Sequence, residues 1–162
     1  DDKVNAINLL SKACGKNGMV FGQYLDIENE NNQSIDIKKL DDIHNLKTGK
    51  LIECAVMLGQ IGSSLESESL NALRDFSSKI GLAFQITDDI LDVTQIESIL
   101  GKNKNSDAKN NKLTYIDIIG LGEAKLKANK LTDLALNSLN QSNITNIDKL
   151  IEMAKYLIGR ES

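Results

Sequence analysis

The sequence predicts an all-α protein. It contains no proline in 162 residues, which removes the residue that most often ends a helix. Apolar residues recur at helical spacing through several long segments, and the stretches between these segments are rich in Asn, Gly and Ser. With 41% apolar residues, a chain of this length can bury a core of its own. We therefore expect one helical domain over residues 1–162.

Two helices are expected at the start of the chain. Residues 3–14 carry apolar side chains at helical spacing and are followed by Gly15, a common stop signal. Residues 18–27 form the second segment, which ends where the chain becomes polar.

One longer helix is expected next. A polar loop over residues 28–34 precedes it, and either Ser34 or Asp36 is a suitable N-terminal cap. Apolar residues then recur at helical spacing from residue 37 to about residue 62. Lys47 falls on the apolar face of this segment, where a lone ammonium group is costly to bury.

The second half of the chain is expected to hold three further helices. The first runs over residues 67–93, and the stretch 98–113, rich in Lys and Asn, is expected to form a loop. After a short element at TYIDIIG, helices are expected over 122–139 and 146–160. The last of these is predicted to begin with a capping box at Thr145.

Composition excludes several classes of protein. The net charge is -4 and only 4% of the residues are aromatic, so the basic, aromatic-rich surface of a nucleic-acid binder is missing. No apolar run approaches the roughly 18 residues of a membrane span, and no signal peptide opens the chain. Cys14 and Cys54 are predicted to be free thiols in a reducing compartment, with a disulfide as the weaker alternative. We therefore expect a cytoplasmic protein.

Three carboxylates crowd into one helical segment, AFQITDDILDV, at residues 83–93. Asp88 and Asp92 lie one turn apart, and Asp89 is about 100° round the helix from Asp88. Like charges at this spacing repel one another, and burial raises the cost unless a cation is present. Without His or Cys beside them, these oxygens favour Mg²⁺, which binds one or two carboxylates together with substrate phosphates. For an isolated motif of this kind, a solvated acidic helix face is the alternative.

Lys47 adds to the prediction of a phosphate site. An ammonium group on the inward face of another helix is best explained by an anion that it was placed to meet. A phosphate bound to Mg²⁺ would be such an anion.

Six segments occur in the order and spacing of a known enzyme family. They are GMVFGQYLDI (18–27), IHNLKTGKLI (43–52), IGLAFQITDDILDV (80–93), LGK (100–102), SDAKNNKLTY (106–115) and GLGEAKLKA (120–128). In these segments the chain resembles the trans-isoprenyl diphosphate synthases of the polyprenyl synthetase family, and most closely the bacterial farnesyl diphosphate synthases, or geranyltranstransferases. The resemblance covers nearly the whole chain, and DDILD is similar to the second aspartate-rich motif of the family.

The resemblance implies both a fold and a reaction. The chain would be the C-terminal portion of an isoprenoid synthase-type helical bundle, and the N-terminal remainder of the same protein would carry the first aspartate-rich motif. The absence of an initial Met agrees with a fragment. The whole enzyme would be a Mg²⁺-dependent homodimer that condenses an allylic diphosphate, dimethylallyl or geranyl, with isopentenyl diphosphate to farnesyl diphosphate. With half of the active site, this chain alone would be inactive.

The resemblance also implies roles for particular residues. Metal would be bound by Asp88, Asp89, Asp92 and Asp107. The allylic diphosphate would be bound by Lys47 and Lys102, with Lys112 nearby. Thr48 and Gln85 would present oxygen dipoles to the carbocation, and so act in catalysis together with Lys47. Gln23 and Asp26 match a substrate-site motif on the adjacent helix. His44 has no second metal ligand at suitable spacing, so it is expected to be a packed helix residue.

Other functions stay open on the sequence alone. A geranylgeranyl or another short-chain prenyl diphosphate synthase shares these motifs, and a non-catalytic helical partner subunit descended from such an enzyme shares the fold. The segments KTG and LGK argue against a terpene cyclase. The chain departs from the family pattern at Phe21, where a glycine is usual and where helices are expected to pass closely.

Overall fold

The computed structural model describes residues 2–32, 34–100 and 113–159, and this part of the chain contains helices and no strand. The helices are α1 (Asp2–Cys14), α2 (Met19–Glu28), α3 (Ile37–His44), the π-helix η1 (Asn45–Gly49), α4 (Lys50–Gly59), α5 (Ser67–Leu100), α6 (Tyr115–Asn140) and α7 (Asp148–Ile158). The prediction of an all-α protein is confirmed.

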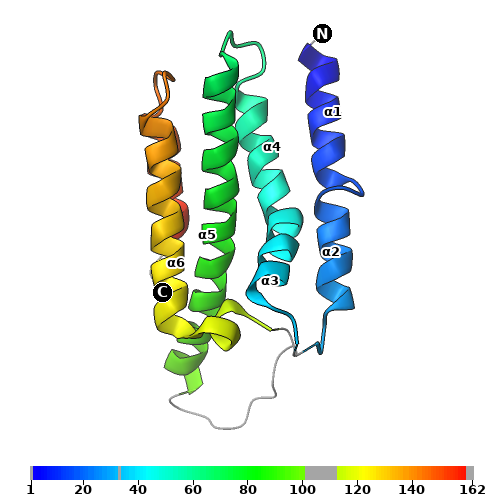
Figure 1. Ribbon diagram of the computed structural model, residues 1–162, viewed down its shortest axis with the longest axis vertical. Helices are drawn as coiled ribbons and strands as arrows, with labels where there is room; N and C mark the ends of the chain where they lie inside the picture. The colour runs from blue at the N-terminus through cyan, green and yellow to red at the C-terminus, as the bar shows by residue number, and fades with distance from the viewer. Residues whose placement is uncertain (1, 33, 101–112, 160–162) are drawn as a thin grey trace.

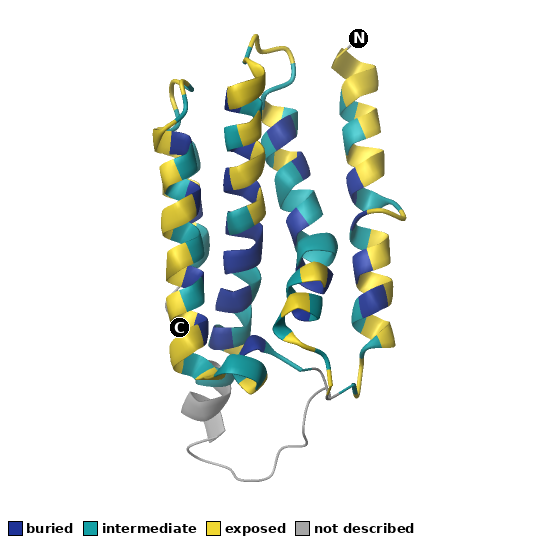
Figure 2. Ribbon diagram, in the orientation of Figure 1, coloured by how far each residue is buried: buried dark blue, intermediate teal, exposed yellow. Residues whose placement is uncertain are grey.

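The helices stand as a row of columns (Figure 1). In this row α6 lies beside α5, α5 beside the column of α3, η1 and α4, and that column beside α1 and α2, with contacts between neighbours. The last helix, α7, packs against α5 and α6. Buried residues concentrate on α5, whereas the outer sides of α1, α2 and α6 are largely exposed (Figure 2). The central helix α5 packs against α3, η1, α4, α6 and α7, whereas α1 and α2 pack against the column of α3, η1 and α4.

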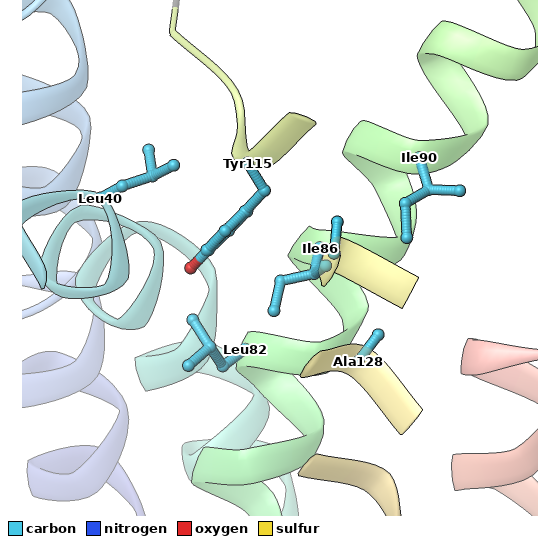
Figure 3. Packing of buried hydrophobic residues seen from close by; sticks show 7 residues of the cluster. Leu40, Leu82, Ile86, Ile90, Tyr115 and Ala128 are labelled. Atoms are coloured by element: carbon cyan, nitrogen blue, oxygen red, sulfur yellow. The ribbon is translucent and has the colours of Figure 1, made fainter. Parts of the chain in front are cut away.

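Two clusters of buried apolar residues hold the row together. One joins α3, α5 and α6, where the fully buried ring of Tyr115 lies among Leu40, Leu82 and Ile86 (Figure 3). The other surrounds Phe76 and joins α4 and α5 to α6 and α7. Tyr115 and Phe76 are thus both core residues.

The single helix predicted over residues 37–62 is wrong in one respect, because η1 divides it into α3 and α4. The start was predicted correctly: the side chain of Asp36 caps α3 by accepting a hydrogen bond from the Lys39 backbone N–H at 2.8 Å. A π turn inserts a residue without abolishing the apolar pattern on either side. Periodicity alone therefore does not reveal it.

The boundaries in the second half also differ from the prediction. The helix predicted to end at residue 93 continues as α5 to Leu100, into the stretch predicted as a loop. The short element and the helix that follows it are joined in α6 across a kink at Gly120, which has φ 79° and ψ 158°. The capping box lies at Thr114 with Asp117, whereas α7 begins without a side-chain cap, so the box predicted at Thr145 is wrong.

Candidate functional site

The π-helix η1 is held between α2 and α5 by glycines that allow backbones to touch. A Cβ atom on Gly22 of α2 would lie 2.2 Å from the backbone nitrogen of Lys47. On the other side, a Cβ atom on Gly81 of α5 would lie 2.9 Å from the Cα atom of Gly49. Neither position has room for a side chain. The backbone that carries Lys47 and Thr48 is thereby fixed on both sides.

Lys47 meets an anion, as the sequence predicted, but the anion is supplied by the protein. Its Nζ atom donates a hydrogen bond to Oδ2 of Asp26 on α2 at 2.8 Å. The Lys47 side chain is 30% exposed and that of Asp26 is 11% exposed, so the ammonium group lies at the edge of the packed region and is open on one side. An ammonium with three donors can keep this pair and still bind a further anion.

Thr48 and Gln85, both predicted as catalytic, are in contact. The Thr48 hydroxyl donates to Oε1 of Gln85 at 2.5 Å and so joins η1 to α5. Both side chains are half-buried. Nothing in sequence spacing connects two residues so far apart, and it was the family resemblance that paired them.

The acidic motif divides its carboxylates between two sides of α5. Asp88 and Asp92 follow Gln85 at three and seven residues, so they share the side of α5 on which Gln85 meets η1. Asp89 instead accepts a hydrogen bond from the backbone N–H of Tyr115, the first residue of α6, at 3.0 Å. Burial raises the pKa of Asp89 to about 6, and the charges of Asp92 and Asp88 add to the increase while the Tyr115 hydrogen bond opposes it.

The carboxylates of Asp88 and Asp92 would supply some of the oxygen ligands that a Mg²⁺ ion needs. Two carboxylates one helical turn apart are ligands of the kind that this ion uses together with phosphate oxygens. Within residues 2–32, 34–94 and 113–159, no group of three or more His, Cys, Asp or Glu side chains converges on one point. Asp107, Lys102 and Lys112, which the resemblance placed in the site, lie outside the described residues.

Gln23 and Phe21 both have exposed side chains on α2. Phe21 is 41% exposed, and its ring stacks on that of Tyr24 with centroids 6.1 Å apart. The close passage of helices falls on Gly22, so the bulky ring at position 21 does not obstruct it.

The sequence did not reveal a polar cluster built around Tyr115. The Tyr115 hydroxyl donates to Asp41 on α3, and Nζ of Lys127 on α6 donates to both carboxylate oxygens of Asp41 at 2.7 and 2.9 Å. The same Nζ atom lies 4.9 Å from the centre of the Tyr115 ring. Tyr115 and Lys127 are 74 and 86 positions from Asp41, respectively, so no local sequence pattern connects them. The cluster ties the start of α6 to α3, next to η1.

His44 packs against the ring of the same tyrosine. Its ring stacks on Tyr115 with centroids 5.5 Å apart. Burial is the main cause that lowers the pKa of His44 to about 4, and the charge of Lys47 contributes to the decrease. Asp26, Asp41 and Gln85 oppose it. The imidazole is therefore neutral at physiological pH. Packing of His44 in the helix was predicted and is confirmed, since it is 8% exposed.

Among the residues that the structure describes, no helix combines the length and the apolar character that crossing a bilayer requires.

The chain is similar to known proteins along its whole length. The Polyprenyl synthetase family model matches residues 1–154. Farnesyl diphosphate synthase of Micrococcus luteus is 38% identical over 161 residues, which cover 98% of this chain and 54% of that protein. Geranylgeranyl pyrophosphate synthase 7, chloroplastic, of Arabidopsis thaliana is 37% identical over 161 residues, which cover 98% of this chain and 46% of that protein.

The chain is also similar to about half of a solved structure. The geranyltransferase of Helicobacter pylori complexed with magnesium and isoprenyl diphosphate superposes with a TM-score of 0.75 at 33% sequence identity, over 98% of this chain and 51% of that one. The chain therefore spans about half the length of the relatives that it matches.

Proposed function

Because the chain belongs to the polyprenyl synthetase family, we propose that it forms one wall of the active site of a prenyl diphosphate synthase. The observation that carries the proposal is the contact between Thr48 of η1 and Gln85 of α5. Lys47 precedes this threonine, and Asp88 follows this glutamine by one helical turn. The contact therefore brings a cation, two oxygen dipoles and the acidic motif into one region.

The proposed reaction joins an allylic diphosphate, dimethylallyl or geranyl, to isopentenyl diphosphate. The allylic C–O bond breaks, and its electron pair leaves with the diphosphate. The double bond of isopentenyl diphosphate then attacks the allylic cation, and the carbon next to the resulting cation loses a proton to form a new double bond. We propose farnesyl diphosphate as the product, with geranylgeranyl diphosphate as the alternative, since relatives named for each product are similarly close.

Lys47 is the residue proposed to receive the leaving diphosphate. Asp26 holds its ammonium group at 2.8 Å, which fixes the position of the charge before any ligand arrives. A cation fixed in advance stabilises charge as it develops without the cost of reorganisation. Lys102 and Lys112 are proposed to add further positive charge, and Gln23 to line the substrate site beside Asp26.

Mg²⁺ is the proposed cofactor. Asp88 and Asp92 are its proposed ligands on α5, with Asp107 holding coordinating water. Asp89 keeps one carboxylate oxygen on the Tyr115 N–H, so its proposed part is to support the ion or its waters through the other oxygen. When bound, the ion neutralises negative charge on the departing diphosphate.

Thr48 and Gln85 are proposed to face the carbocation. The Thr48 proton is donated to Gln85, so the lone pairs of the hydroxyl oxygen, which carry its negative charge, remain available to an electron-poor carbon. A hydroxyl that donates a hydrogen bond also becomes a better acceptor.

The partners proposed for the chain are its N-terminal remainder and a second copy of the whole protein. The outer face of α1 and α2 supports such an assembly, because large apolar side chains are 41–68% exposed on it. They are Val4, Ile7, Leu10, Val20, Phe21, Tyr24 and Ile27. Contiguous exposed apolar surface is characteristic of a face that a partner covers. Cys14 and Cys54 are free thiols, in keeping with the proposed cytoplasmic location.

Product analysis tests the function. The chain assembled with its N-terminal remainder is incubated with geranyl diphosphate, isotopically labelled isopentenyl diphosphate and Mg²⁺, and the products are dephosphorylated and separated. Labelled farnesol is expected from the assembly, and no product from this chain alone. Failure of the assembled protein to elongate any allylic diphosphate would overturn the proposal.

Asp88→Ala is the matched variant, with Asp75→Ala as control. Asp75 lies on the same helix but pairs at the surface with Lys79 and Ser138. Asp88→Ala is expected to lower kcat/KM by at least about 100-fold, whereas Asp75→Ala is expected to leave it unchanged. Equal activity of both variants would remove the acidic motif from the mechanism.

A further inference from the structure

His44 carries a buried polar ring that the proposed reaction does not use. Its side chain is only 8% exposed, and neither ring nitrogen has a hydrogen-bond partner among the residues that the structure describes. A buried polar atom without a partner costs about 1–3 kcal/mol, so native structures contain few of them. Such an atom therefore needs an explanation in terms of function.

The surroundings of His44 keep the ring fixed and uncharged. Tyr115 stacks against it, and the tyrosine is itself held by its hydroxyl on Asp41. The neutral form is the one that suits this place. A second positive charge beside Lys47 would oppose any carbocation formed nearby.

The polar contact of functional interest near His44 is the hydrogen bond between Thr48 and Gln85. Thr48, which contacts Gln85, follows His44 by four residues, and Gln85 opposes the lowering of the His44 pKa, as a carboxamide oxygen near a ring N–H does. In the structure the two groups fall short of hydrogen-bond alignment. The last torsion of a glutamine side chain is soft, so the carboxamide is free to rotate toward the ring N–H.

Thr48 alone does not determine which way the Gln85 carboxamide faces. A hydroxyl donates to a carboxamide oxygen and accepts from a carboxamide NH₂ group equally well. The two orientations differ in function, because in the flipped one the hydroxyl lone pairs are engaged and the positive NH₂ group faces the site. A second donor aimed at the oxygen removes this ambiguity.

We propose that His44 is a positioning residue, whose ring N–H donates to Oε1 of Gln85 and thereby keeps that oxygen turned toward Thr48. With the ring N–H aimed at the oxygen, a flipped carboxamide would turn its NH₂ group against that N–H. The Thr48 proton is then committed to Gln85, and the Thr48 lone pairs face the developing cation. The inference rests on the proposed function, since it deepens the role of Thr48 and Gln85 in prenyl transfer.

Three variants of His44 test the inference in the assembled enzyme. His44→Phe keeps a ring on Tyr115 but removes the donor. His44→Asn and His44→Gln place an amide N–H at the positions of Nδ1 and Nε2, respectively. His44→Phe is expected to lower kcat about 10- to 100-fold with KM for the allylic diphosphate unchanged, and one of the two amide variants is expected to recover most of the loss.

Stability distinguishes this role from a structural one. Because His44→Phe keeps a ring stacked on Tyr115 and removes two polar nitrogens from a buried position, its melting temperature is expected to equal or exceed that of the parent while its turnover falls. A melting temperature that falls together with activity in all three variants would overturn the inference, as would unchanged turnover in His44→Phe. Ser77→Ala, a fully buried polar position elsewhere on α5, is the control for general effects of core substitution.

A spectroscopic measurement keeps the inference separate from the proposed function. His44 is the one histidine in these 162 residues, and its ring ¹⁵N and ¹H signals in the assembled protein are identified by their loss in His44→Phe. We expect one tautomer with an N–H proton protected from solvent, and loss of that protection in Gln85→Leu. Protection that survives Gln85→Leu would overturn the inference even in an active enzyme. An inactive parent with the expected signals would instead overturn prenyl transfer and leave the hydrogen bond standing.

Discussion

Replacing Gly22 with alanine is expected to destabilise the protein, although alanine is the better helix former. The new methyl group would lie 2.2 Å from the Lys47 nitrogen and 2.6 Å from the Leu46 carbonyl carbon. Both are backbone atoms, so rotation of a side chain cannot relieve the contact. To reach an ordinary separation of 3.4 Å or more, α2 and η1 have to move apart by about 1 Å.

The size of the effect follows from two opposing contributions. Overpacking of this kind costs about 3 kcal/mol at the upper end of its usual range, and the exchange of Gly for Ala within a helix returns about 1 kcal/mol. The net loss is about 2 kcal/mol, or about 4–8 °C in melting temperature for a protein of this size.

Gly122→Ala is the matched control, because Gly122 is also inside a helix but has nothing within 4 Å of the added atom. It is expected to gain about 0.4–1 kcal/mol. Thermal unfolding followed by far-ultraviolet circular dichroism gives both values. If Gly22→Ala melts at or above the temperature of the parent while Gly122→Ala behaves as expected, the close packing of α2 on η1 is refuted.

The other predictions concern charge and capping. Lys47→Met should weaken diphosphate binding by the assembled protein about 10- to 100-fold by calorimetry; an equal loss in Lys50→Met, which removes a lysine paired on α4, would count against a specific role. In metal-free buffer, acidification from pH 7 to 4 should lower the free energy of unfolding by about 2–3 kcal/mol through His44, because folding lowers its pKa to about 4. The same acidification should raise the free energy of unfolding by a similar amount through Asp89, because folding raises its pKa to about 6. In urea titrations Asp89→Asn should therefore become more acid-sensitive than the parent and His44→Phe more acid-resistant, and matching pH profiles would contradict both shifts. Thr114→Ala should lower the free energy of unfolding by about 1 kcal/mol, since it removes the cap of α6, and an unchanged melting temperature would show that the cap is dispensable.

The helical segments were predictable because each carries its own apolar periodicity. Asp36 was predictable as one of two candidate caps, since a cap depends on only a few neighbouring residues. The need of Lys47 for an anion was also predictable from the cost of an unpaired ammonium, although the sequence gave no means of choosing Asp26, which lies 21 residues away, over a bound phosphate. Local energetics thus predicted that partners exist, and the fold determined which ones.

The wrong predictions of helix boundaries and caps have a different cause, because patterns that look alike in sequence do not form the same structure. Thr145 and Thr114 both precede an acidic residue at capping distance, but only the box at Thr114 forms, because α7 begins at Asp148 with Ile147 at its N-cap position. Sequence adjacency groups Asp89 with Asp88 and Asp92, and only the fold reveals that its carboxylate also accepts a hydrogen bond from Tyr115 of another helix. Two residues one position apart on a helix point about 100° apart, so membership of a motif does not guarantee a shared role.

The π turn at Asn45–Gly49 accommodates one extra residue between α3 and α4. In an uninterrupted α-helix, the orientation of every residue is fixed by its distance from the core positions, so Lys47 would follow the apolar stripe. One extra residue in the turn frees that orientation and lets the apolar stripes on both sides stay directed at the core. Deletion of a single residue between positions 45 and 49 would convert the π turn into an α turn, so that α3 and α4 keep their orientation but the residues of the turn lose theirs. The length of this segment is consequently under tighter constraint than the identity of most of its residues.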